Sequence, residues 1–213
     1  MNSVANYSRS INETHRICTH DISGHLHLLR FCMDEINENK GEASKELLSR
    51  LDEGLEKLED LNKLLKICTR YFDPNGKLNS ESIAEKAFGL VKLYHHKFLG
   101  NISYEVSGVE YFELEKGTTV IEAIFGVSST LCHFAAIQNL GDVNIKVTFK
   151  DQEVLLSTAI ANIENQEINE LLKNGNENDK TLRRAYAHEL VEQCGGEIIY
   201  ESDPSQTSVR IRI

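Results

Sequence analysis

The chain has 213 residues, of which 40% are hydrophobic and 26% are charged, a balance typical of a folded protein that buries a substantial core. Its formal net charge of −10 argues against nucleic acid and anionic membranes as partners. No apolar run approaches the length of a membrane span, and the stretch MNSVANYSRSINETH lacks the basic start and apolar run of a signal peptide, so we expect a cytoplasmic protein.

The first predicted element is a long amphipathic helix. Its apolar side chains recur in steps of three or four from Ile22 to Ile36, which is the spacing of one helical face. The same stretch contains His20, which is followed directly by the acidic Asp21. The polar segment NENKG at 37–41 ends in glycine and predicts a turn after this helix.

A second helix follows the turn. Leucines recur in a nearly heptad rhythm from Leu47 to Leu65, with Glu and Lys between them, as in helices packed in a bundle. The sequence DPNG at 73–76 then ends the helix, since proline cannot continue it and Asn-Gly favours a turn. An isolated pair of helices cannot cover both apolar stripes, so we expect residues 1–73 to form a helical hairpin that dimerises into a four-helix bundle. The alternative is that the C-terminal half of the same chain covers them.

Residues 77–213 alternate between helical and strand patterns. The predicted helices and strands, in chain order, are a helix in 79–98, a strand in 101–108, a buried helix over Thr118–Ile137, strands in 143–150 and 153–162, a helix in 179–196, and strands in 197–202 and 207–213. The residues DQ and DPSQ predict the turns of two hairpins. This order predicts an α/β sandwich with one mixed sheet and helices on one face.

Two motifs resemble the core of bacterial sensor histidine kinases. The stretch HDISGHLHLL at 20–29 is similar to the H-box of that family, in which the phosphorylated histidine precedes an acidic residue. The stretch LRRAYAHELVEQCGGEIIYESDPSQTSVRIRI at 182–213 is similar to the closing segment of the ATP-binding domain. The resemblance runs in order from about Ile11 to Ile213. It implies an α+β fold, with the hairpin of a dimeric four-helix bundle at 1–73 and a histidine-kinase ATPase-like α/β sandwich at 77–213.

The chain departs from this family where the family binds ATP. The helix VIEAIFGVSSTLCHF has residues 127–130, Val-Ser-Ser-Thr, where the asparagines of the N-box are expected. The segment TAIANIENQEI contains neither the Asp nor the glycines of the adenine-binding motif, and NGNENDKTLRRA offers only Gly175 for a glycine-rich lid. A phosphate cradle needs several backbone amides free of Cβ obstruction. We therefore expect a degenerate domain without ATP binding or autokinase activity.

What remains resembles the histidine phosphotransferases that descend from degenerate kinases. The resemblance implies that His20 relays a phosphoryl group between receiver-domain aspartates of response regulators, and that Asp21 orients or deprotonates the imidazole. It implies no cofactor of its own, because the receiver partner supplies magnesium. Imidazole suits this role, since its neutral form is a nucleophile near physiological pH.

The resemblance also implies a docking surface for the receiver on the first helix. Its residues are Gly24, His27, Leu28 and Phe31. Gly24 would leave room for the incoming aspartyl phosphate. Active kinases often carry at this place a polar residue used for dephosphorylation, so we expect no phosphatase activity.

Several alternatives stay open. The chain could be a non-catalytic pseudokinase that sequesters or scaffolds a response regulator, which is favoured by Gly24-His25 where the H-box commonly has a small polar residue and a proline. It could also be an active kinase with an unusual ATP site. His20 could be an ordinary solvated residue, with His15 as a weaker phosphoryl acceptor. The five cysteines form no CxxC pair, so no zinc knuckle is indicated. A zinc site from His15, Cys18, His20 and His25 has little support, because it offers only separations of three and five residues and no supporting carboxylate geometry.

Overall fold

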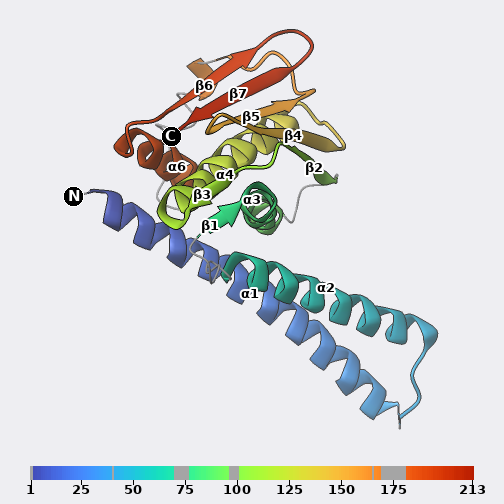
Figure 1. The fold of residues 1–213 in the computed structure, drawn as a ribbon. Coiled ribbons are helices and arrows are strands. Elements are labelled where there is room, and N and C mark those ends of the chain that lie inside the picture. Colours follow the sequence, from blue (N-terminus) through green and yellow to red (C-terminus); the bar gives the residue numbers. More distant parts are fainter. Residues whose placement is uncertain (1, 40, 70–76, 96–100, 165, 169–180) are drawn as a thin grey trace.

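The computed structural model describes residues 2–39, 41–69, 77–95, 101–164, 166–168 and 181–213 (Figure 1). Two long helices, α1 (Asn2–Glu38) and α2 (Lys45–Thr69), run in opposite directions and pack against each other. They extend away from a second part that contains the remaining helices and all the strands. The side chains of residues 2–18 and 64–69 lie outside the described part of the chain, as does the predicted DPNG turn.

The turn between the two long helices lies where the sequence predicts it. α1 ends at Glu38, and Gly41 takes the left-handed conformation with φ of +89° that glycine adopts without steric cost. The amide of Gly41 donates to the carbonyl of Ile36 over 2.9 Å. α2 then starts with a cap, because the Oγ atom of Ser44 accepts a hydrogen bond from the amide of Leu47 over 3.1 Å.

A five-stranded sheet forms the centre of the second part. The strands are β2 (Ile102–Ser107), β4 (Val143–Lys150), β5 (Glu153–Thr158), β6 (Glu197–Ser202) and β7 (Thr207–Arg212). Their order is β2-β4-β5-β7-β6, in which β2 pairs parallel with β4 and every other pair is antiparallel. The predicted mixed sheet is therefore confirmed, although β5 ends four residues before the predicted strand does.

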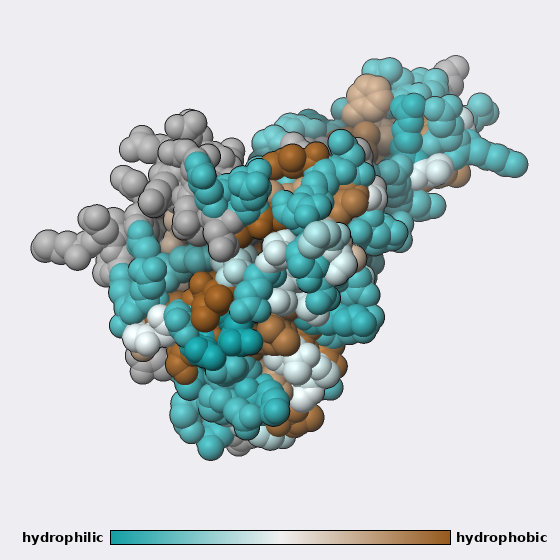
Figure 2. All heavy atoms as spheres, turned by 90° about the horizontal axis from the view of Figure 1, so that it is seen from above, coloured by the Kyte–Doolittle hydropathy of each residue, from teal (hydrophilic) through white to brown (hydrophobic). Residues whose placement is uncertain are grey.

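Three helices cover one face of this sheet (Figure 1). They are α3 (Ser80–Tyr94), α4 (Leu114–Ile137) and α6 (Thr181–Gln193), and α4 packs against both of the others. The opposite face carries polar side chains, and Arg212 there donates to Glu153 over 2.6 Å and to Glu197 over 2.7 Å. Figure 2, which looks onto the sheet side of the molecule, shows a mainly hydrophilic surface with small apolar groups. The layered sandwich predicted from the sequence is confirmed.

A small antiparallel ribbon was not predicted. It joins β1 (Lys77–Asn79) to β3 (Tyr111–Glu113), with Leu78 opposite Phe112. Each strand has only three residues, which is too short to show an alternating pattern. The two strands are also far apart in sequence, so their pairing depends on the tertiary structure.

The predicted turns of the sheet are confirmed. Asp151 and Gln152 have φ of 54° and 63°, and positive φ at both central residues is the conformation of a type I′ hairpin turn. In the second hairpin, the carboxylate of Asp203 accepts hydrogen bonds from the amides of Ser205 and Gln206. Asn79 caps α3 by accepting from the amide of Ser82 over 2.8 Å.

The central helix α4 is the core of the sandwich. Its segment Lys116–Ile137 has the length and the apolar composition of a membrane span. Our expectation that no apolar run approaches that length was therefore wrong. Most of this segment is buried inside the protein, between the sheet and the neighbouring helices. A core helix that is covered on most sides is apolar around most of its circumference, which gives it a composition similar to that of a membrane span.

The hydrophobic core continues from the sandwich into the helical pair. Leu61 of α2 belongs to the same cluster of buried residues as the interior of the sandwich, and Ile22 of α1 packs against it. α1 also contacts α6, and α2 contacts α3. The C-terminal half thus covers one end of the helical pair, as the alternative to dimerisation predicted. Farther along, Leu26 and Met33 of α1 and Leu48 and Leu55 of α2 remain exposed.

Candidate functional site

His20 lies on the solvent-facing side of α1. Its side chain is 74% exposed, whereas the side chain of the next residue, Asp21, is only 15% exposed. The Nδ1 atom of His20 lies 3.1 Å from the Oδ1 atom of Asp21. The two residues that the sequence singled out as a catalytic pair are therefore in hydrogen-bonding contact.

This contact selects one tautomer of the neutral imidazole. An ionised carboxylate only accepts hydrogen bonds, so the ring nitrogen that faces it must carry the proton. With the proton on Nδ1, the lone pair is on Nε2. Within the part of the chain that the structure describes, Nε2 has no hydrogen-bond partner. The arrangement presents an exposed nucleophilic nitrogen with a carboxylate behind the ring.

The predicted docking residues surround His20 unequally. Gly24, His27 and Phe31 lie within about 40° of His20 around the helix axis by the 3.6-residue repeat, and all three are exposed. A Cβ atom on Gly24 would meet nothing within 4 Å, so the surface beside His20 is open. Phe31 exposes 59% of its surface and so places an apolar ring on the same face. Leu28 is rotated toward α2, where its Cδ2 atom is 3.6 Å from a Cβ built on Gly54.

The other candidate ligands do not assemble with His20. His25 is half-buried and faces α2, where it interacts electrostatically with Glu53. The side chains of His15 and Cys18 lie outside the described residues. The predicted zinc site and the alternative phosphoryl acceptor His15 therefore also fall outside the described part of the chain. Among the residues that the structure describes, no group of three or more His, Cys, Asp or Glu side chains is placed to hold a metal ion.

The hydroxyl residues that replace the expected N-box asparagines point into the protein. Ser128, Ser129 and Thr130 are fully buried in the middle of α4. The Oγ atom of Ser129 lies 2.8 Å from Nε2 of His95, and Thr130 donates to the carbonyl of Gly126 over 2.9 Å. Two of the three hydroxyls are thus used in contacts within the protein.

The packing of α6 on α4 is unusually close at the same level. A Cβ atom built on Gly126 would lie 2.4 Å from the Cβ atom of Ala187, so only glycine fits at this position. Arg184 and Ala187 of α6 are both buried there. Direct contact between two helices leaves no room for a ligand at this crossing point.

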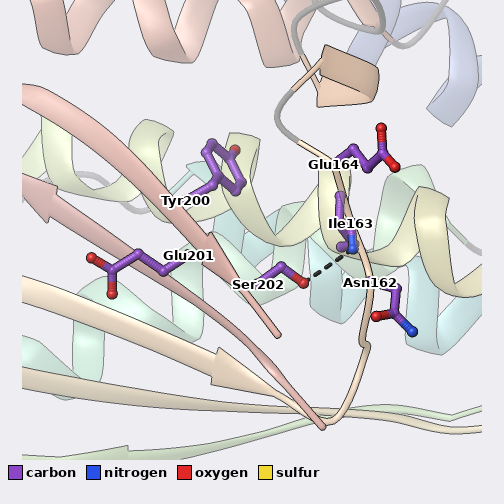
Figure 3. Close-up of a pocket in the computed structure, with 6 residues that line it drawn as sticks. All are labelled: Asn162, Ile163, Glu164, Tyr200, Glu201 and Ser202. Carbon is purple, nitrogen blue, oxygen red and sulfur yellow. Dashed lines mark hydrogen bonds between the residues drawn. The ribbon is translucent and has the colours of Figure 1, made fainter. Parts of the chain in front are cut away.

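A polar cleft of about 620 Å³ lies beside the edge strand β6 (Figure 3). It is lined by residues 162–164 on one side and by Tyr200, Glu201 and Ser202 on the other. The amide of Ile163 donates to Oγ of Ser202 over 3.0 Å and holds the two walls together. Two carboxylates, from Glu164 and Glu201, line this cleft and would repel a polyphosphate. Residues 169–180, which contain most of the expected lid, lie outside the described residues.

A half-buried polar pair that the sequence did not indicate links α6 to β6. The rings of His188 and Tyr200 stack at 5.8 Å with an angle of 6° between their planes. His188 bonds through Nδ1 to the carbonyl of Arg184 and through Nε2 to the hydroxyl of Tyr200, each over 3.0 Å. Burial lowers the pKa of His188 and raises the pKa of Tyr200, so both remain neutral. Both ring nitrogens of His188 are occupied, which gives it a structural role.

Comparisons with known proteins show which solved structures have a similar fold. No protein-family model and no curated protein sequence matches the chain. A solved structure of a bacterial phosphotransferase is similar over 95% of this chain and 95% of that chain, with a TM-score of 0.61 and 10% sequence identity. The histidine kinase domain of the blue-light activated histidine kinase EL346 from Erythrobacter litoralis is similar over 89% of this chain and 94% of that chain, with a TM-score of 0.50 and 10% identity.

The chain therefore has the fold shared by a bacterial phosphotransferase and a histidine kinase domain. The resemblance to a histidine phosphotransferase with a kinase-like core, predicted from short motifs, is confirmed at the level of the fold. The similarity covers both the helical pair and the sandwich, since it extends over nearly the whole chain. Because the sequence identity is only 10%, single sequence motifs gave weak evidence for this similarity.

Proposed function

We propose that this protein is a cytoplasmic histidine phosphotransferase that relays phosphoryl groups between response-regulator receiver domains through His20. The observation that carries the proposal is the contact between His20 and Asp21 on an exposed helical face. The fold it shares with a bacterial phosphotransferase supports the same class of reaction.

The proposed reaction needs no proton transfer during the phosphoryl step. The Nε2 lone pair of neutral His20 forms a bond to the phosphorus of a receiver aspartyl phosphate, while the bond from phosphorus to the aspartate oxygen breaks. The electron pair of that bond stays on the released carboxylate. The ring becomes a phosphorylated imidazolium with its proton still on Nδ1, and the Asp21 carboxylate stabilises this positive charge. The reverse reaction with a second receiver aspartate completes the relay.

The surface around His20 supports docking of a folded partner. Gly24 leaves open space beside the imidazole, while Phe31 and, less fully, Leu28 offer apolar contact, and His27 adds a polar group on the same face. Phosphoryl transfer depends mainly on positioning and on neutralising charge. In the proposed complex the magnesium ion belongs to the receiver partner.

We further propose that the sandwich does not bind ATP. The buried hydroxyls of α4, the close contact of Gly126 with Ala187 and the acidic lining of the cleft all support this. Titration with magnesium-ATP in a calorimeter is expected to give no binding heat, and labelled ATP is expected to leave the protein unlabelled. Saturable binding with transfer of label to His20 would instead identify an active kinase.

A homodimer through the helical pair is the third part of the proposal. The exposed Leu26 and Met33 are seven residues apart on α1, and Leu48 and Leu55 are seven apart on α2. Each pair forms a stripe along one helix side, and such stripes pack together in four-helix bundles.

The central test is transfer from a phosphorylated receiver. Wild-type protein is expected to acquire label that is lost in acid, with the phosphate mapped to His20 by mass spectrometry. The His20→Ala variant should acquire none, whereas Ser23→Ala, which changes an exposed neighbour on the same helix, should match the wild type. Equal labelling of the His20→Ala variant, or no labelling of the wild type by any receiver, contradicts the proposal.

The alternative is a non-catalytic module that binds a response regulator. The pair Gly24-His25 favours it, because these positions differ from the H-box of kinases. In that case the His20→Ala variant should retain receiver binding in a pull-down, and neither protein should acquire label.

A further inference from the structure

We infer that Ile22 is a positioning residue, and that the sandwich, instead of binding nucleotide, holds α1 in the rotation that presents His20 to a partner. This inference rests on the proposed function of His20 and adds a role for the second half of the chain. It starts from the fact that Ile22, two residues after His20, packs against the cluster of buried residues that joins Leu61 of α2 to the interior of the sandwich.

Three consecutive residues face three different directions. Successive residues of a helix are about 100° apart, so Ile22 is about 200° around the axis from His20. Ile22 contacts the core, Asp21 is mostly covered, and His20 is 74% exposed. Anchoring Ile22 therefore fixes the direction of His20 and keeps the Asp21 carboxylate at the inner edge of the imidazole.

Within the described side chains, the joint between the helical pair and the sandwich lies at the level of Ile22. Leu61 of α2 belongs to the common core, and α1 and α2 contact α6 and α3 respectively. Leu29 and Cys32, farther along α1, lie outside that core: Leu29 packs at Gly54 of α2, with its Cδ2 atom 3.1 Å from a Cβ built on the glycine. Among the side chains of the helical pair that the structure describes (19–39, 41–63), those that join the buried cluster of the sandwich, Ile22 and Leu61, lie at the level of His20.

Loss of this anchor should affect the rate of transfer more than docking. Without the Ile22 side chain, α1 could rotate or shift slightly against the sandwich, and small misplacements of a reacting group cost large factors in rate. The docking surface at Phe31 lies farther along the helix and should persist.

The test compares Ile22→Ala with Leu29→Ala, which removes a half-buried side chain of similar size from the same helix but not from the common core. Quench-flow transfer from a phosphorylated receiver is expected to show roughly a tenfold lower saturating rate constant for Ile22→Ala, with little change in the receiver concentration for half-maximal rate. Leu29→Ala should keep both values, and Ile22→Val should restore most of the rate.

A second measurement does not depend on transfer. Nitrogen chemical shifts of the His20 ring report which nitrogen carries the proton, and Ile22→Ala is expected to lower the Nδ1–H share while Leu29→Ala preserves it. An unchanged tautomer share together with an unchanged rate overturns the inference. If the wild type accepts no phosphoryl group at all, the proposed function fails, and the tautomer share alone then decides whether Ile22 positions His20. Should Ile22→Ala not fold, the same comparison is made with Ile22→Val, for which a smaller shift in the same direction is expected.

Discussion

Gly126 of α4 contacts Ala187 of α6 so closely that any side chain on the glycine would overlap the alanine, since the two Cβ atoms would be 2.4 Å apart. Gly126→Ala should therefore destabilise the protein by about 1–3 kcal/mol, even though alanine is favoured over glycine in a helix by about 1 kcal/mol. Denaturant unfolding measures the change. The double variant Gly126→Ala with Ala187→Gly should recover much of the loss, and failure to recover it would show that the overlap is not the cause.

Asp21→Asn should slow phosphoryl transfer without unfolding the protein. The amide of asparagine can donate to Nδ1, which favours the tautomer with its proton on Nε2. In that tautomer Nε2 has no free lone pair to attack phosphorus. The variant also lacks the charge that stabilises the imidazolium. We expect a decrease of about 10- to 100-fold in the single-turnover rate constant. A rate equal to that of the wild type would mean that the carboxylate does not orient His20.

The half-buried pair His188 and Tyr200 predicts a loss of stability in acid. Burial lowers the pKa of His188 below its ordinary value of 6.5, so the unfolded chain binds this proton more tightly than the folded protein does. Stability from this residue is therefore present above about pH 6.5 and decreases as the pH falls below it. Thermal unfolding between pH 7.5 and pH 5.5 should show a smaller pH dependence for His188→Gln than for the wild type. The same slope for both proteins would assign the acid sensitivity to other groups.

The proposed dimer predicts a specific response to charge on the exposed stripes. Met33→Glu places a carboxylate on the apolar stripe of α1, and burying it at an interface would cost several kcal/mol. Light scattering is expected to give the mass of a dimer for the wild type and of a monomer for this variant. Ser23→Glu, which adds the same charge outside that stripe, should remain dimeric. A wild type that is monomeric at all concentrations contradicts the dimer.

Much of the fold could be predicted from the sequence because its signals are local. The strand β4 spans Val143–Lys150 as predicted, since alternating side chains on a half-buried strand are visible in the sequence itself. The pair His20-Asp21 was also evident, because adjacent residues need no tertiary structure to meet. Ile22 was recognised as part of an apolar stripe, and its position opposite His20 was the only signal of a positioning role.

Other features required the tertiary structure. The ribbon of β1 and β3, the stacked rings of His188 and Tyr200, and the contact of Gly126 with Ala187 each join segments that are separate in the chain. The local repeats of 2 and 3.6 residues show which side of an element is apolar, so the long helices and the strands of the main sheet could be predicted from the sequence. Which apolar faces pack together depends on burial shared among distant segments, so the joining of the helical pair to the sandwich through Ile22 and Leu61 is visible in the folded structure and not in the sequence.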